Sequence, residues 1–138
     1  MDTSATFSAL ADDGWKQRPF PGYMELVGPL WSRREEAGWA YGLLATPRHL
    51  NPAGIVHGGL ITSLLDQALS INAWEAMGRR ACVTIQLDTQ FMAAAREGQF
   101  LVVRSRAVRT TNTLAFMQGA LSVSDEEIAT ASALLKLI

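Results

Sequence analysis

The sequence has little cysteine, little charge and no long apolar run, and each scarcity excludes a class of protein. Cys82 is the only cysteine among 138 residues, so an intramolecular disulfide is impossible. Residues 1–7 lack the basic and apolar regions of a signal peptide. No stretch approaches the roughly 18 consecutive apolar residues that a membrane-spanning helix needs. We therefore expect a cytoplasmic protein that does not enter the membrane.

Charged and metal-binding side chains are also scarce. The 12 basic and 13 acidic residues leave a net charge of −1 and form no polybasic block, so nucleic acid is not an expected partner. His49 and His57 have no cysteine or carboxylate cluster at ligand spacing, so we expect no metal. No Gly-x-Ser-x-Gly motif and no phosphate-binding glycine loop with lysine occurs. We expect His49 at the surface and Cys82 as a buried structural thiol.

Apolar residues, by contrast, are abundant. They make up 49% of the chain, against 18% charged residues, which is more apolar material than one core needs. This surplus predicts association between subunits, because large exposed apolar patches are uncommon on monomers. The length suits a single domain. We assign it to residues 22–138, preceded by an N-terminal segment, residues 1–21, that is helical over residues 3–13.

The pattern of apolar and polar residues predicts one long helix among strands. The helix covers residues 58–77, is about 30 Å long and is apolar over a broad face. Four consecutive strands after it form an expected antiparallel meander with short polar turns. The expected strands are residues 23–34, 38–46, 81–93, 99–109, 113–123 and 128–138, with Pro29 marking the first as an edge or bulged strand. These elements predict an α+β fold in which a curved antiparallel sheet wraps around the helix.

A candidate site lies where this helix begins. The segment Asn51-Pro-Ala-Gly-Ile-Val-His57-Gly58-Gly59 places two glycines where a loop becomes a helix. Free backbone N–H groups and the positive end of the helix dipole suit a developing oxyanion there. A tight contact between helix and sheet would explain the two glycines equally well.

Asp66 is a carboxylate on an otherwise apolar helix, seven residues after Gly59. It either faces solvent or a subunit interface, or it does chemistry, because a buried unpaired carboxylate is costly. Gly58 and Asp66 are about 12 Å apart along one helix, so one carbonyl cannot easily contact both. If both act on one carbonyl, two helices must pack antiparallel about a two-fold axis. The result would be a homodimer with shared active sites.

Asn51, His57, Gly58, Gly59 and Asp66 together resemble the signature of the hotdog-fold thioesterase superfamily, most closely its PaaI-like branch. The likeness extends over residues of roughly 22 to 138, through the order of the elements. It implies an acyl-CoA thioesterase, a thioester hydrolase whose only coenzyme is the coenzyme A of its substrate. Asp66 would be the nucleophile or the general base.

The resemblance also implies roles for other residues. The N–H of Gly58 would polarise the thioester carbonyl, and Asn51 would orient the water or the thioester. His57 would position the substrate, unless its ring only fixes the loop to a carbonyl group. Thr84 would hydrogen-bond to the water or the carboxylate, unless it is only a β-branched strand residue. The helix itself adds candidate substrate contacts, Gly59, Ser63, Trp74 and Met77, of which Trp74 and Met77 share a stripe with Asp66 and would otherwise pack in the core or an interface.

Two other functions stay open for such a chain. One is a hotdog enoyl-CoA hydratase or dehydratase, although the histidine and acid motifs of those enzymes are missing. The other is a non-catalytic acyl-CoA-binding protein, which a carboxylate on the helix argues against. Coenzyme A phosphates would need basic residues, and the candidates are Arg79, Arg80, Arg104, Arg106 and Arg109, unless these are solvated surface charges. Two dimers could also associate into a homotetramer.

Overall fold

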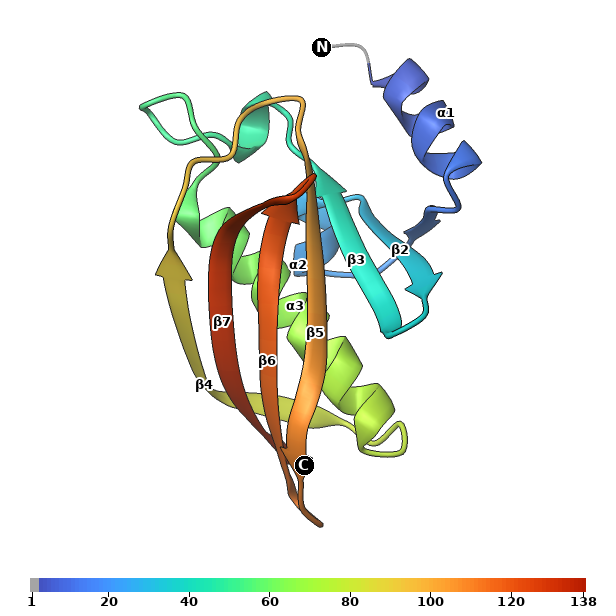
Figure 1. Ribbon diagram of the computed structural model, residues 1–138, viewed down its shortest axis with the longest axis vertical. Coiled ribbons are helices and arrows are strands. Elements are labelled where there is room, and N and C mark those ends of the chain that lie inside the picture. The colour runs from blue at the N-terminus through green and yellow to red at the C-terminus, as the bar shows by residue number, and fades with distance from the viewer. Residues whose placement is uncertain (1–2) are drawn as a thin grey trace.

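A computed structural model describes residues 3–138 and shows a curved antiparallel sheet wrapped around one long helix (Figure 1). Met1 and Asp2, part of the expected N-terminal segment, lie outside the described residues. The elements are α1 (Ser4–Asp12), β1 (Lys16–Arg18), α2 (Tyr23–Val27), β2 (Leu30–Glu35), β3 (Gly38–Leu44), a 3-10 turn (Pro47–His49), α3 (Gly58–Ala76), β4 (Cys82–Phe91), β5 (Phe100–Thr110), β6 (Leu114–Val123) and β7 (Glu126–Leu137). The expected α+β hotdog architecture is confirmed.

The sheet order corrects the expected meander. The strands lie in the order β1-β2-β3-β5-β6-β7-β4, so β4 pairs with β7 rather than with its successor β5. Strands β5, β6 and β7 do form a meander, but β4 crosses to the far edge. Strand β4 directly follows α3, which crosses the concave face of the sheet, and β4 joins the far edge beside β7. One edge of β4 is therefore unpaired within residues 3–138.

The expected strand over residues 23–34 is wrong in its first half. Residues Tyr23–Val27 form the short helix α2, which buries Met24 against the core. Gly22 has a φ of 81°, a conformation open to glycine, and it turns the chain into this helix. Strand β2 begins only at Leu30, so Pro29 precedes the strand instead of causing a bulge inside it. Alternating hydrophobicity over so few residues did not distinguish helix from strand.

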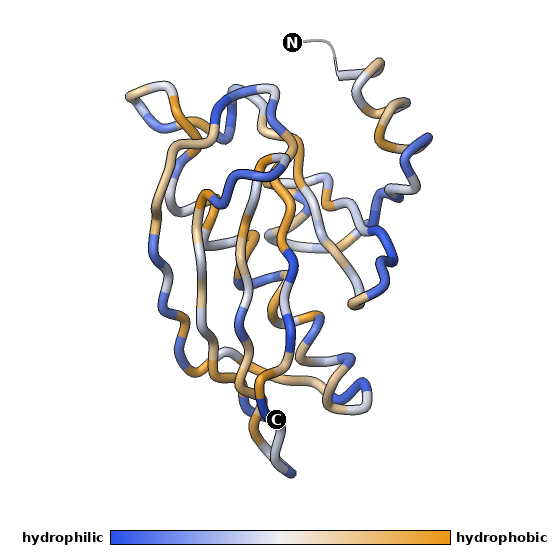
Figure 2. Tube along the Cα trace, in the orientation of Figure 1, coloured by the Kyte–Doolittle hydropathy of each residue, from blue (hydrophilic) through white to orange (hydrophobic). Residues whose placement is uncertain are grey.

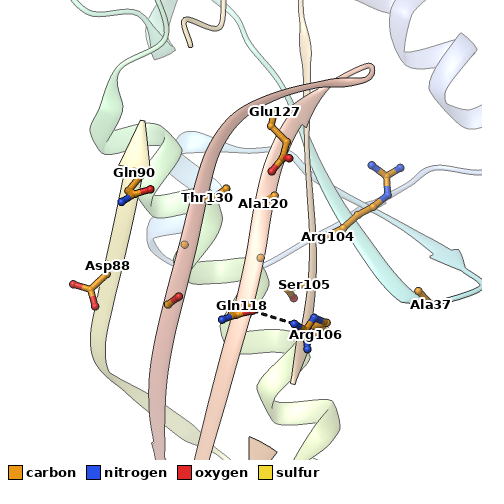
Figure 3. Close-up of a pocket in the computed structure, with 13 residues that line it drawn as sticks. Ala37, Asp88, Gln90, Arg104, Ser105, Arg106, Gln118, Ala120, Glu127 and Thr130 are labelled. Atoms are coloured by element: carbon orange, nitrogen blue, oxygen red, sulfur yellow. Dashed lines mark hydrogen bonds between the residues drawn. The ribbon is translucent and has the colours of Figure 1, made fainter. Parts of the chain in front are cut away.

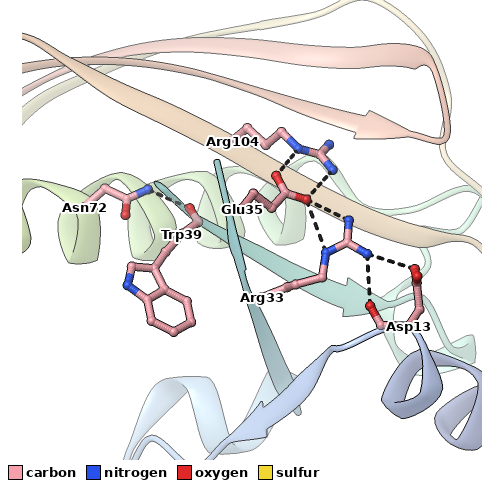
Figure 4. A network of polar contacts seen from close by, with 6 residues as sticks. All are labelled: Asp13, Arg33, Glu35, Trp39, Asn72 and Arg104. Atoms are coloured by element: carbon pink, nitrogen blue, oxygen red, sulfur yellow. Dashed lines mark hydrogen bonds and ion pairs between the residues drawn. The ribbon is translucent and has the colours of Figure 1, made fainter. Parts of the chain in front are cut away.

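The core lies between α3 and the concave face of the sheet. Leu64, Leu65 and Ala68 of α3 are fully buried there, and the colouring in Figure 2 shows the apolar positions along the chain. At Gly119 the sheet approaches the helix so closely that a Cβ atom would lie 2.8 Å from Leu69. Asn72 fixes the helix, since its amide donates to Ser105 Oγ at 2.7 Å and to the Trp39 carbonyl at 3.3 Å (Figure 4).

The N-terminal segment belongs to the same sheet through β1, which pairs with β2. Helix α1 brings Phe7 and Leu10 against Trp15 and Trp31, on the outer face of the sheet away from α3. We expected a helix over residues 3–13, and Gly14, with a φ of 88°, follows the end of α1. The division between residues 1–21 and 22–138 stays a prediction. No helix within residues 3–138 is long and apolar enough to cross a bilayer.

Candidate active site

The first turn of α3 has one N–H that is satisfied and one that is free. His57 caps the helix, and its Nδ1 accepts a hydrogen bond from the Gly59 N–H at 2.8 Å. The His57 ring thus holds a backbone N–H, not a carbonyl group as in the alternative that we considered, and its role in positioning the substrate stays a prediction. A neutral ring in this role carries its proton on Nε2, so Nε2–H is left as a donor. Within residues 3–138, the N–H of Gly58 donates to no acceptor.

The space around the two glycines does not support a tight contact between helix and sheet. A Cβ atom on Gly58 would lie 3.5 Å from the Phe91 ring, which is an ordinary van der Waals distance. A Cβ atom on Gly59 would lie 2.9 Å from Nδ1 of His57. Gly59 is therefore needed for the His57 cap, whereas Gly58 leaves its own N–H open to a ligand.

The loop before the helix is fixed by Asn51 and His49. Asn51 Oδ1 accepts the N–H groups of Ala53 and Ile55, at 3.0 and 3.2 Å, so only its NH₂ group is left to act on a substrate. His49 is 4% exposed, and the expectation that it lies at the surface is wrong. Its Nδ1 accepts the Thr46 N–H at 3.0 Å. The remaining ring nitrogen then donates to the Val27 carbonyl at 2.5 Å.

Burial explains the role of His49. It lowers the pKa of the His49 ring, against a smaller opposing effect of the hydrogen bond to Val27. The neutral ring ties the loop to the end of α2, and the His49 carbonyl also accepts the N–H of His57. His49 thus positions the loop that carries the cap of α3. The contact with Thr46 is local, but the contact with Val27, 22 residues away, could not be seen in the sequence.

Asp66 is half-buried and held by a hydroxyl group from β4. Thr84 Oγ1 donates to Asp66 Oδ1 at 2.7 Å, and Ser70 Oγ lies 3.4 Å from the same hydroxyl. Asp66 Oδ2 has no hydrogen-bond partner within residues 3–138. Thr84 is thus more than a β-branched strand residue. Ser63 lies one turn before Asp66, where its hydroxyl donates to the Gly59 carbonyl and meets Tyr23 Oη at 2.7 Å.

An apolar hollow of about 460 Å³ opens beside this group, between α3 and the inner faces of β2 and β3. Ser70 links it to Asp66 through Thr84. Its walls include Phe20, Trp39, Tyr41, Trp74 and Cys82. Burial, together with the Glu75 carboxylate, raises the pKa of Tyr41 to about 12, so Tyr41 stays a neutral phenol.

Three residues that we discussed from the sequence, Trp74, Met77 and Cys82, can be compared with this hollow. Trp74 lines it, as an acyl-pocket residue would. Met77 is 4% exposed and belongs to the core, so it does not line the hollow. Cys82 is only half-buried, and the expectation of a buried thiol is wrong because β4 is an edge strand. The aromatic residues Trp39 and Tyr41 were missed, since only the fold brings β3 to the helix.

Four of the five arginines that we considered for coenzyme A phosphates lie in two places, and the fifth, Arg109, is exposed near the end of β5. Arg79 and Arg80 follow α3, where Arg79 contacts Glu75 at 3.4 Å and stacks over the Trp74 ring. Arg104 and Arg106 lie on the outer face, in a hollow of about 670 Å³ away from Asp66 (Figure 3). Within residues 3–138, no group of three histidine, cysteine or acidic side chains is arranged to hold a metal ion.

The chain is related to known proteins over most of its length. The thioesterase superfamily matches residues 53–130, more than half of the chain, and the chain belongs to this superfamily. A Pseudomonas aeruginosa protein named "Putative esterase PA0474" is 28% identical over 116 residues, which are 83% of this chain and 87% of the relative. These findings support a thioesterase activity in general.

Three solved structures share the fold. One is a phenylacetic acid degradation-related protein from Ralstonia eutropha, named "putative thioesterase". It is 27% identical with a TM-score of 0.77, and the match covers 87% of this chain and 92% of that chain. A single-residue variant of the phenylacetic acid degradation protein PaaI from Thermus thermophilus is 18% identical with a TM-score of 0.73, covering 84% and 98%. The smu.793 protein of Streptococcus mutans, bound to acetyl CoA, is 20% identical with a TM-score of 0.67, covering 76% and 84%. The resemblance to the PaaI-like branch is confirmed.

Proposed function

We propose that this protein is an acyl-CoA thioesterase that hydrolyses its substrate to a free acid and coenzyme A. The observation that carries the proposal is the Asp66 carboxylate, which Thr84 holds at 2.7 Å beside an apolar hollow. One carboxylate oxygen stays free for a water molecule or a carbonyl carbon. The hollow offers an apolar place for the acyl group. The acetyl CoA bound by the related fold from Streptococcus mutans supports coenzyme A as the carrier.

The reaction needs only groups that the chain supplies, together with water. As a general base, Asp66 would accept a proton from water while the water oxygen bonds to the thioester carbon. As a nucleophile, it would bond to that carbon itself, and water would then cleave the anhydride. In both routes the carbon–sulfur bond breaks and the coenzyme A thiolate leaves and takes up a proton. No metal or redox cofactor takes part in the proposed reaction.

The Gly58 N–H is the proposed oxyanion donor. It is free, and it lies at the N-terminus of a 19-residue helix, where backbone N–H groups and the helix dipole favour negative charge. His57 Nε2–H and the Asn51 NH₂ group are further donors in the same loop. Asn51 would orient the thioester or the water through this NH₂ group, because its oxygen is already engaged in the loop.

We also propose a homodimer with shared active sites. Asp66 lies about 12 Å along α3 from Gly58 of its own chain, so the partner's Gly58 would complete each site. The unpaired edge of β4 supports this, since an exposed ten-residue edge strand is a ready surface for pairing with a second copy. Phe91 and Met92, at the end of this strand, are 53% and 52% exposed. A cytoplasmic location stays a prediction.

Thiol release from a panel of acyl-CoAs tests the activity. The wild type should hydrolyse at least one of them, and Asp66→Asn and Asp66→Ala should each lose about 100-fold or more in kcat. Hydrolysis that survives both substitutions would contradict the assigned role of Asp66. Tight acyl-CoA binding without hydrolysis by the wild type would indicate a non-catalytic binding protein instead. Hydration of an enoyl-CoA would indicate a hydratase.

A further inference from the structure

The Tyr41 hydroxyl group opens on the apolar hollow and has no partner. Tyr41 is 5% exposed, and its Oη makes no hydrogen bond within residues 3–138. The polar side-chain atoms of these residues that are sealed without a partner are Trp31 Nε1 and Thr89 Oγ1, so the Tyr41 hydroxyl still reaches the hollow that this residue lines. Because burial raises its pKa to about 12, the phenol is neutral and can donate a hydrogen bond. A nearly buried donor without an acceptor is costly, so we expect a ligand to supply the acceptor.

A guanidinium group lines the same hollow. Arg18 is the register neighbour of Leu30, a core residue, so it lies on the face of the sheet that packs on α3. Its Nε donates to Ser32 Oγ at 2.6 Å, which leaves its two terminal nitrogens as free donors. Ser32 is in turn the register neighbour of Tyr41. Within residues 3–138, Arg18 forms no ion pair with a carboxylate.

These two groups lie at the end of the hollow that is away from Asp66. Along α3 the hollow extends from Ser70, the end near Asp66, to Glu75, about 8 Å further. The charges of Glu75 and Arg18 both act on the pKa of the Tyr41 phenol, so the phenol and the guanidinium are near the Glu75 end. We call this the far end of the hollow.

The far end has one cation without a counter-charge. Glu75 contacts Arg79 at 3.4 Å, so a neighbouring residue balances its carboxylate. Arg18 has no such partner, and its guanidinium lies 5.6 Å from the centre of the Trp39 ring. The hollow between its two ends is apolar, with walls that include Phe20, Trp39, Ile71 and Trp74. This arrangement matches an apolar chain that carries an anionic group at its end.

A carboxylate would satisfy both groups at once. Its two oxygens can accept charge-assisted hydrogen bonds from the Arg18 nitrogens, and one of them can also accept from the Tyr41 hydroxyl. A methyl group in the same place would leave the hydroxyl unpaired, and a neutral hydroxyl group would leave the guanidinium without a counter-charge. Sites built around buried donors discriminate strongly against analogues that lack the acceptor.

We propose, on the basis of the thioesterase activity proposed above, that the acyl group of the substrate ends in a carboxylate, which Arg18 and Tyr41 bind at the far end of the hollow. The substrate class is then the mono-coenzyme A thioester of a dicarboxylic acid with an apolar middle. Its thioester lies at Asp66 and its middle contacts the aromatic walls. The products are the free dicarboxylic acid and coenzyme A.

Paired substrates on the full chain test this specificity. Hexanedioyl-CoA and hexanoyl-CoA differ only at the end of the acyl chain, and matched pairs from four to ten carbons cover other lengths. For the best pair, the wild type should have a kcat/KM for the dicarboxylic thioester that is about tenfold or more above that for its monocarboxylic counterpart. A ratio at or below one for every pair would overturn the proposal. A stronger preference for 6-hydroxyhexanoyl-CoA than for hexanedioyl-CoA would also overturn it.

Variants at the far end assign the preference to its residues. Arg18→Gln should lower the ratio about tenfold, and Tyr41→Phe should lower it about fivefold. Arg18→Lys keeps the charge and should retain more of the preference than Arg18→Gln. Arg109→Gln, at an exposed position near the end of β5, is the matched control and should keep the wild-type ratio. Circular dichroism checks that each variant is folded.

The ratio also separates the acyl carboxylate from the phosphates of coenzyme A as the anion that Arg18 binds. Both thioesters of a pair carry the same coenzyme A, so only a contact with the acyl end changes the ratio. A loss in Arg18→Gln that is equal for both thioesters would assign Arg18 to the phosphates and overturn the proposal.

Binding measured without turnover distinguishes this proposal from the thioesterase proposal. Isothermal titration of Asp66→Asn with the same pairs should show a Kd about tenfold lower for the dicarboxylic thioester. If the thioesterase proposal fails, no thioester is hydrolysed but this preference in Kd remains. If only the present proposal fails, thioesters are hydrolysed and the preference is missing from both kcat/KM and Kd.

Discussion

The hydroxyl group of Thr84 determines how the Asp66 carboxylate is presented. Its hydrogen bond occupies Oδ1 and leaves Oδ2 without a partner among residues 3–138, and Ser70, which lines the apolar hollow, lies beside the same hydroxyl. A carboxylate without this bond could rotate about its side-chain torsions and face solvent. Catalysis by a base or a nucleophile depends on such orientation, because small displacements of a reacting group are costly.

Replacement of Thr84 by valine tests this positioning role. Thr84→Val keeps the β-branched shape but removes the donor, and we expect kcat to fall about tenfold to hundredfold with KM little changed. Thr84→Ser keeps the hydroxyl group and should retain most of the activity. The measurement is steady-state thiol release with the best acyl-CoA of the panel. Equal kcat values for the valine and serine variants would contradict the role of the hydrogen bond.

At the scale of elements, an ion-pair network joins the N-terminal segment to β2 and β5. Arg33 contacts Asp13 at 2.8 Å and Glu35 at 2.7 Å, and Arg104 contacts Glu35 at 2.7 Å (Figure 4). The hydrogen bond from Arg104, aided by Arg33, lowers the pKa of Glu35 to about 2, although burial opposes this. The Arg33 guanidinium also lies 4.6 Å from the centre of the Trp15 ring. The network thus fixes the segment that carries α1.

The lowered pKa of Glu35 has a consequence for acid stability. Because the folded state lowers this pKa from 4.5 to about 2, the contribution of Glu35 is complete above pH 4.5 and is lost as the pH falls toward 2. Glu35→Gln should reduce the free energy of unfolding at pH 7 by about 1 kcal/mol, a modest value since Arg104 is partly solvated. Urea denaturation at pH 7 and pH 3 measures it.

The adjacent glutamate, Glu36, provides the control for this experiment. Glu36 is exposed and has no ion pair within residues 3–138, so Glu36→Gln should leave the unfolding free energy near that of the wild type. The difference between Glu35→Gln and the wild type should shrink at pH 3. A difference that is the same at both pH values would show that the effect of Glu35 does not depend on its charge.

At the scale of the whole molecule, the question is which chain supplies each half of a site. Gly58 is the first residue of α3, where proline is well tolerated and lacks an N–H group, and His57 has the extended backbone that precedes proline. Gly58→Pro should therefore remove the oxyanion donor without breaking the helix. A homodimer of the Gly58→Pro variant should be inactive, and so should a homodimer of the Asp66→Ala variant.

Co-expression of these two variants tests shared sites. In a mixed dimer, the Gly58 of one chain and the Asp66 of the other make one intact site out of two. With equal expression, half of the dimers are mixed, so about a quarter of the wild-type activity should return. Mixed dimers purified through two different tags should have about half. No recovery in purified mixed dimers would place both halves of each site in one chain.

The parts of the site that are close in sequence could be predicted, and the parts that are close only in space could not. Asn51, His57, Gly58 and Asp66 belong to one loop and one helix, and their spacing indicated the site. The walls of the hollow, Trp39 among them, come from strands whose place beside α3 depends on the sheet order. His49 was misplaced at the surface because its contact with Val27, which helps to bury it, joins parts of the chain that only folding brings together.

By itself, the sequence determined the long helix and the order of the main strands along the chain, while the shared site inferred from helix length stays a prediction. These follow from local rules: the period of apolar residues, the breaking effect of glycine and proline, and 1.5 Å of rise per residue. Only the tertiary structure decided that β4 lies beside β7, that Thr84 meets Asp66, and that the Tyr41 hydroxyl opens on the hollow. Each of these depends on contacts between residues distant in sequence, which form only when the sheet closes around α3.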